Sequence, residues 1–172
     1  MPLLVKGVLV ADHVCSLKYD PAIDGPQSIP GDGAYHLVRF PYGGHESYDP
    51  DNMHAQSRGG SDHPFSDQQS GLIWPALPAG KSAWAEIKAM IQWKPGNATE
   101  YRDRFTRDPL NLSTGADSTC TEHRPPSPGM QCFAKAWAMW VSPETPLGLM
   151  VAHNSASPIH LDVCEFKISY RT

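Results

Sequence analysis

The sequence has little charge, and its acidic and basic residues nearly balance. Asp, Glu, Lys and Arg make up 19% of the 172 residues and leave a formal net charge of −4. Without a basic surplus the chain does not attract a phosphate backbone, so the composition argues against a nucleic-acid-binding protein. There is no run of 18 apolar residues, so no transmembrane helix is predicted.

Common catalytic and targeting motifs are also missing. The chain contains no G-x-S-x-G, H-E-x-x-H or G-x-x-x-x-G-K-[ST] pattern, which argues against three frequent enzyme classes. Residues 1–7 have no basic segment, no long apolar core and no small-residue cleavage site. We therefore expect synthesis in the cytosol and, if the protein leaves the cell, a route other than secretion.

The four cysteines, Cys15, Cys120, Cys132 and Cys164, lie far apart and form no C-x-x-C pair. The tetrahedral zinc pattern is therefore absent. A reducing compartment favours free, buried thiols. The alternatives are two disulfides, in any of three connectivities, or a reactive thiol.

Proline and glycine are abundant, with 17 and 14 residues. An α-helical bundle tolerates so many helix breakers badly, whereas short strands joined by turns tolerate them well. Residues 85–93 (AEIKAMIQW) alternate apolar and polar side chains with a period of two, and Pro95-Gly96 follows as a turn. This pattern predicts a half-buried strand.

Further strands are predicted by similar patterns, at residues 5–17, 35–40, 132–141, 147–151 and 159–170. Residues 101–105 fit either an edge strand or one capped helical turn, and Asp108-Pro109 favours the strand. In residues 132–141, alanines occupy one face, which indicates a strand covered on both sides.

Residues 159–170 change register near Val163-Cys164. A β-bulge explains this change, and a strand buried on both faces at its middle explains it equally well. At least six strands with turn-rich joints predict a single domain, residues 1–172, with an antiparallel β-sandwich fold that is a jelly roll. The polar stretches 43–70 and 111–130 are expected to be long loops that make functional or partner contacts.

The densest group of potential metal ligands contains His45, Asp49, Asp51 and His54. The carboxylates and the Asn52 side chain suit calcium, and the histidines suit a transition metal. The spacing matches no EF-hand loop, however, and an ordinary turn explains the same residues. No metal or other cofactor is therefore predicted, and a metal-assisted hydrolase using His45, Asp51 and His54 is the least favoured function.

His153 and Trp74 are candidates for two other kinds of site. His153 follows a strand pattern, so a partly buried strand-end histidine is favoured over a catalytic base, and no catalytic residue is assigned. Four of the five tryptophans lie on or beside strand patterns, where core or interface packing is common. Trp74 is the exception, and with the histidine-rich loop it suggests a glycan-binding surface.

Several segments together resemble minor tail proteins, small structural proteins of the tailed phages that infect actinobacteria. The resembling segments span most of the chain in order: LVADHVCSL (9–17), GDGAYHLVRFP (31–41), RDPL with STG (107–110, 113–115), HRPPSPG (123–129), and TPL with VAHN (145–147, 151–154). The resemblance implies a non-enzymatic virion component built on a β-sandwich. It also implies a homotrimer, as in tumour-necrosis-factor-like jelly rolls, and it carries over no catalytic residue.

The expected partners are therefore copies of the chain and other virion proteins, and not nucleic acid or a membrane. Low charge and strand-borne aromatics suit large subunit contacts, and we assign the interface to Trp137, Met139 and Trp140. The alternative function is a tail module that binds a glycan of the host cell wall.

Overall fold

The computed structural model describes residues 3–5, 8–44, 46–56, 68–127 and 129–172. Two single helical turns lie wholly within these residues, α1 (Pro21–Asp24) and η2 (Gln68–Gly71). The strands are β1 (Leu3–Val5), β2 (Val8–Val10), β3 (Asp12–Tyr19), β4 (Ser28–Ile29), β5 (His36–Leu37), β6 (Leu72–Ile73), β7 (Ala83–Trp93), β8 (Tyr101–Arg107), β9 (Asp117–Arg124), β10 (Gln131–Val141), β11 (Leu147–His153) and β12 (Ile159–Arg171).

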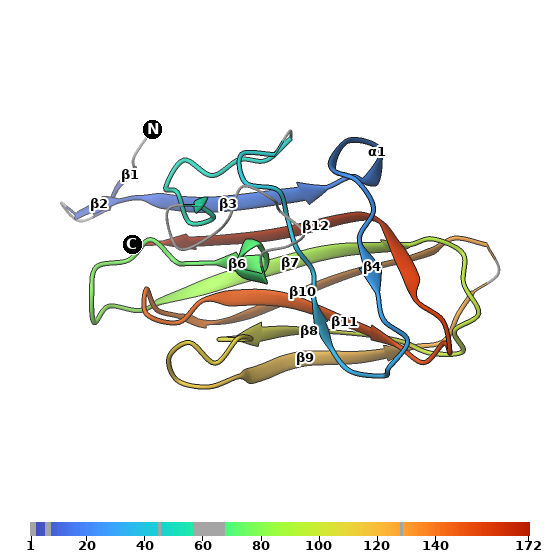
Figure 1. Ribbon diagram of the computed structural model, residues 1–172. Coiled ribbons are helices and arrows are strands. Elements are labelled where there is room, and N and C mark those ends of the chain that lie inside the picture. Colours follow the sequence, from blue (N-terminus) through green and yellow to red (C-terminus); the bar gives the residue numbers. More distant parts are fainter. Residues whose placement is uncertain (1–2, 6–7, 45, 57–67, 128) are drawn as a thin grey trace.

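The long strands form two antiparallel sheets packed face to face, and both run along the length of the molecule (Figure 1). The first sheet has the order β10-β7-β12-β3, and β4 pairs with β12. The second sheet has the order β5-β11-β8-β9, and β6 pairs with β11. β1 and β2 form a separate two-stranded sheet. The predicted all-β sandwich is confirmed.

The core lies between the two sheets. In β7 the odd-numbered residues are buried, whereas Trp84, Glu86 and Lys88 on the other face are exposed. Phe166 of β12 stacks on Phe105 of β8, with ring centroids 6.0 Å apart, and so joins the first sheet to the second. The period-two pattern of the sequence therefore places one face of each central strand in the core.

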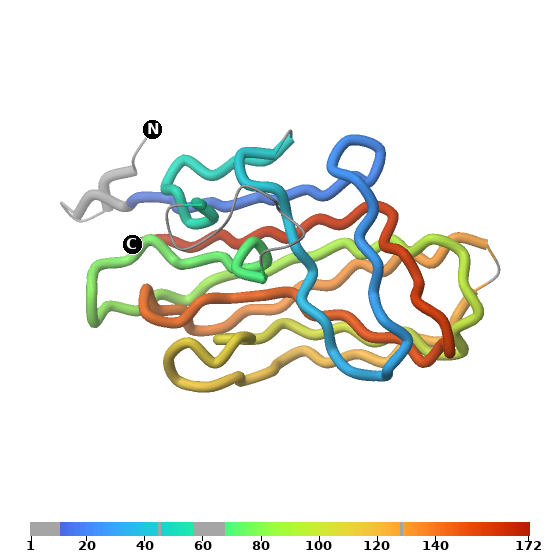
Figure 2. Tube along the Cα trace, viewed as in Figure 1, coloured from blue at the N-terminus to red at the C-terminus, as the bar shows by residue number. Residues whose placement is uncertain are grey.

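The two long sides of the sandwich differ. On one side, β4 pairs with β12 of the first sheet and β5 pairs with β11 of the second. Figure 2 shows the connecting segment, in light blue, crossing the strands. On the opposite side lie the edge strands β9 and β10, and no strand in the described part of the chain pairs with their outer edges. One side is thus covered and the other is open.

Several strand predictions are confirmed. Residues 101–107 form a strand and not a helical turn. The register of β12 shifts between Leu161 and Cys164, so the β-bulge is the correct explanation of the register change. The extra residue keeps both Leu161 and Cys164 buried on the core side.

Two expectations were wrong. Residues 111–130 are not one long loop, because β9 occupies Asp117–Arg124. As an exposed edge strand, β9 has no alternation of apolar residues to reveal it. The alanine face of β10 is not covered by any described segment, since Ala134 and Ala136 are exposed. Small side chains there form an open surface and not a second packed layer.

Candidate functional site

Three tryptophans are exposed on the neighbouring strands β7 and β10. Trp84, Trp137 and Trp140 are 55%, 49% and 56% exposed. Large aromatic side chains usually contribute most of their area to the core, so three exposed ones on paired strands stand out. Apolar side chains gathered on one surface mark an interaction site.

Trp84 and Trp140 form a pair on the outer face of the first sheet. The two residues are directly opposite each other in the β7–β10 register. Their ring centroids are 5.3 Å apart and the ring planes meet at 80°, an edge-to-face contact. Such a contact contributes about 0.5–1.5 kcal/mol and fixes one indole against the other. We call these two residues the tryptophan pair.

A groove on the same outer face lies beside the tryptophan pair. It has a volume of about 690 Å³, and Trp84, Glu86, Ser169, Arg171 and Asp12 are among its lining residues. Glu86 lies opposite Ser169 in the β7–β12 register, and an ion pair joins Arg171 to Asp12 on β3. We call it the outer groove; it combines an aromatic wall with donors and acceptors.

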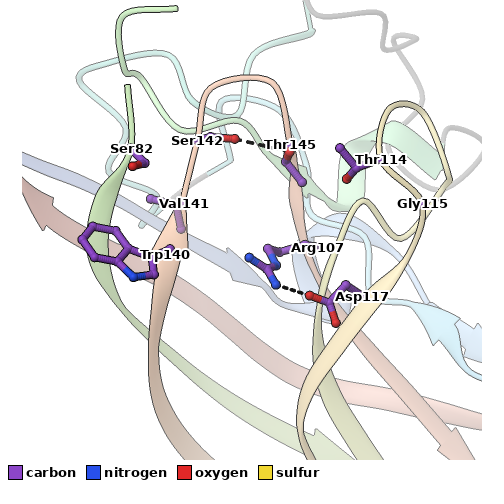
Figure 3. A pocket seen from close by; sticks show the side chains of 9 residues that line it. All are labelled: Ser82, Arg107, Thr114, Gly115, Asp117, Trp140, Val141, Ser142 and Thr145. Atoms are coloured by element: carbon purple, nitrogen blue, oxygen red, sulfur yellow. Dashed lines mark hydrogen bonds and ion pairs between the residues drawn. The ribbon is translucent and has the colours of Figure 1, made fainter. Parts of the chain in front are cut away.

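A second hollow, of about 390 Å³, lies at the end of the open side (Figure 3). Arg107 of β8 and Asp117 of β9 form an ion pair on one wall. The Ser142 hydroxyl donates to the Thr145 hydroxyl at 3.3 Å on the other wall. In Figure 3 the indole of Trp140 lies on the far side of β10 from the ion pair. Trp140 is nevertheless among the residues that line this hollow, whereas Trp84 is not.

The turn between β8 and β9 supplies another wall of this hollow and is organised by Asp108. Its carboxylate accepts hydrogen bonds from the N–H groups of Leu112, Ser113 and Gly115, at 2.6, 2.8 and 2.8 Å. Burial raises the pKa of Asp108, but these hydrogen bonds lower it by more, so the net pKa lies below the usual value. The side chain thus acts as an ionised cap for the turn.

Trp137 belongs to a different surface. It lies opposite Ile87, a core residue, so its side chain is on the inward face of β10. β10 is an edge strand, and half of the Trp137 side chain remains exposed there. Met139, the third predicted interface residue, is 7% exposed and belongs to the core. Trp137 therefore lies on the open side, Met139 lies in the core, and Trp140 lies on the outer face of the first sheet.

Buried charges tie β10 to the second sheet. The Lys135 ammonium binds the Asp103 carboxylate of β8 and the Cys120 carbonyl of β9. Arg124 Nε donates to the other oxygen of Asp103 at 3.1 Å. Cys120 has a positive φ of 49° at an irregularity in the β8–β9 pairing. These contacts hold the edge strand in place.

The predicted metal ligands are engaged separately. The N–H groups of Met53 and His54 donate to the Asp49 carboxylate at 2.8 and 2.7 Å, as in an ordinary turn. Asp51 pairs with His13, 2.9 Å away. His45 lies outside the described residues. Among the residues that are described, no three potential ligands meet to hold a metal ion.

The surroundings of His153 do not suit a catalytic base, and those of Trp74 do not suit a residue that stacks on a sugar. His153 is fully buried, its Nε2 is 3.0 Å from the Ile29 carbonyl, and the Ser155 N–H donates to its Nδ1. Trp74 is only partly exposed. Its backbone N–H bonds to the Met53 carbonyl at 2.8 Å. The glycan-binding surface expected at Trp74 therefore exposes less aromatic surface than the tryptophan pair does.

All four cysteines are free thiols in this structure. Cys15 and Cys164 are buried, whereas Cys132 is exposed. Burial raises the pKa of Cys164 to about 12, which keeps this thiol protonated and unreactive.

Trp84 was expected to pack in the core or at an interface, and the Arg107–Asp117 wall was not expected. The signal for Trp84 was present, because the same alternation that buries Ala85 puts Trp84 on the face of Glu86. No such signal existed for Arg107 and Asp117, since their contact requires the pairing of β8 with β9.

Comparison with known proteins adds no assignment: no protein family matches this chain, and no curated protein matches it either. Within the described residues, the helices are too short to cross a membrane.

Proposed function

We propose that this protein is a non-enzymatic virion subunit that assembles with copies of itself through the outer edge of β10. The observation that carries this proposal is the edge itself. It is 11 residues long, has the half-exposed Trp137 near its centre, and has no paired strand in the described part of the chain. Edge strands offer a row of backbone donors and acceptors to another strand.

The side chains of β10 favour a second copy as the occupant. The outward residues Ala134, Ala136 and Ala138 are small and uncharged. The one lysine, Lys135, is 1% exposed and bound to Asp103, so it does not protect the edge from pairing. Natural edge strands that stay unpaired usually carry exposed charges or prolines. β10 has neither, as expected of a strand that is covered in an assembly.

The order of the strands supports a jelly roll. When β3, β5 and β7–β12 are numbered one to eight along the chain, the first sheet reads 6-3-8-1 and the second reads 2-7-4-5. Each sheet thus alternates early and late strands, as two interlocked Greek keys require. Jelly rolls of eight strands occur in viral capsid and lectin domains.

The virion role in this proposal rests on the resemblance to minor tail proteins. That resemblance includes segments on both sheets, such as residues 12–17 in the first and 151–153 in the second. We propose a homotrimer, in which neighbouring copies or other virion proteins cover the open side of each sandwich.

A mass measurement in solution tests the assembly. We expect a mass three times the 18.9 kDa of the single chain. Trp137→Ala should weaken association about 30-fold, because a central tryptophan contributes about 2 kcal/mol to an interface. Trp84→Ala is the matched control, since it removes an exposed indole from the other face and should leave the mass unchanged. A single-chain mass at every concentration would contradict the proposal.

The virion assignment needs its own measurement. Purified particles of the phage that encodes this chain should contain the protein in a fixed ratio to the other tail or capsid proteins. Its absence from particles, with the assembly intact, would overturn the virion role alone.

A further inference from the structure

The tryptophan pair lies on a surface that would stay exposed when the outer edge of β10 pairs with another copy of the chain. Pairing at the edge extends the first sheet sideways and covers Trp137, whereas Trp84 and Trp140 project from its outer face. Both are more than half exposed. The proposed assembly therefore does not account for these two side chains.

We propose that the tryptophan pair and the outer groove form a binding site for a neutral polysaccharide. Sugar rings present C–H groups on their faces and hydroxyl groups around their rims. The C–H faces stack on indoles, and the hydroxyl groups need donors and acceptors beside them. An exposed aromatic pair next to a polar groove meets both needs.

The floor of the outer groove is low enough for a sugar chain to lie along it. In the row next to the tryptophan pair, Val14, Ser169, Glu86 and Ala138 are cross-strand neighbours. Ala138 and Ser169 are small, so the indoles of Trp84 and Trp140 stand above this row. The edge-to-face contact holds both indoles in place, which reduces the entropy lost on binding.

The charges beside the site favour a neutral ligand. Arg171 pairs with Asp12, and Lys88 pairs with Glu86. Each cation is matched by an anion, so the groove has no surplus of either sign to attract a charged polymer. The paired groups still offer donors and acceptors to hydroxyl groups.

Native gel electrophoresis through gels that contain a dissolved polysaccharide tests the site. The probes are arabinogalactan, mannan and a soluble β-glucan, with hyaluronan as the anionic comparison. We expect at least one neutral polymer to retard the protein. Trp84→Ala and Trp140→Ala should each weaken this binding about 10-fold, equivalent to about 1.4 kcal/mol for one lost stacking face.

Tyr48→Ala is the matched control, because it removes a 60% exposed aromatic side chain that neither lines the outer groove nor belongs to β10, and it should keep the retardation. Thermal unfolding of each variant checks that the fold is intact. No retardation by any of the three neutral polymers would overturn the inference, and so would retardation by hyaluronan alone or binding that survives both Trp84→Ala and Trp140→Ala. These outcomes leave the measured mass, and with it the proposed assembly, unaffected.

Discussion

Asp103→Ala should lower the free energy of unfolding by about 3–5 kcal/mol, the usual cost of removing one partner from a buried ion pair. The Asp103 and Lys135 side chains are 3% and 1% exposed. Without the carboxylate, the Lys135 ammonium loses its counter-charge, keeps the Cys120 carbonyl as an acceptor and lies 5.0 Å from the centre of the Phe105 ring. Arg124 also loses an acceptor. Urea denaturation measures the difference.

Two further variants separate burial from charge. Asp103→Leu combined with Lys135→Met removes both charges and should recover most of the lost stability. Asp117→Ala breaks the Arg107–Asp117 pair, whose carboxylate is 56% exposed, and should cost less than about 1 kcal/mol. Equal costs for Asp103→Ala and Asp117→Ala would contradict the buried position of Lys135.

This ion pair also affects the proposed assembly. Lys135 is the residue of β10 that binds both β8 and β9, so it fixes the edge strand to the second sheet. A loosened β10 presents its edge less precisely and loses more entropy when it pairs. Asp103→Ala should therefore weaken association as well as folding.

Asp108→Ala should lower the free energy of unfolding by about 3 kcal/mol, because three backbone N–H donors of the turn after β8 lose their buried, charged acceptor. Asp108 also has a positive φ of 47°, which alanine adopts less readily than aspartate or asparagine. Asp108→Asn keeps the shape and one acceptor oxygen, so it should lose less stability than Asp108→Ala. A cost below that of Asp117→Ala would contradict the capping role.

The same carboxylate makes stability depend on pH. The pKa of Asp108 is lower in the folded than in the unfolded chain, where it is about 3.9. Its stabilising contribution is therefore complete above the unfolded pKa and is lost as the pH falls through the folded pKa. Urea denaturation between neutral and acidic pH should show a smaller loss for Asp108→Asn than for the wild type. Identical pH profiles would contradict an ionised cap.

The fold could be predicted where one face of a strand is buried. The alternation in residues 85–93 identified β7, and the register change near Cys164 identified the bulge in β12. β9 could not be predicted, because its side chains face solvent and its polar sequence looks like a loop. Burial creates a sequence pattern, and an exposed edge strand has none.

The candidate site was harder to predict for a related reason. The assignment of Trp137, Met139 and Trp140 to one interface followed from their shared strand, but the strand turns them to different surroundings. Trp84 joins Trp140 only through the β7–β10 register, across more than 50 residues of sequence. Pairing register and edge position are tertiary properties, and no local pattern encodes them.

Amide hydrogen exchange in β10 tests the central claim most directly, namely that the outer edge of this strand pairs with another copy. With rising protein concentration, the amides of residues 131–141 that point away from β7, toward the open edge, should become protected from exchange in the wild type. In Trp137→Ala they should stay unprotected over the same range. Exchange in β10 that does not change with concentration, in a sample whose mass shows an oligomer, would contradict assembly through this edge.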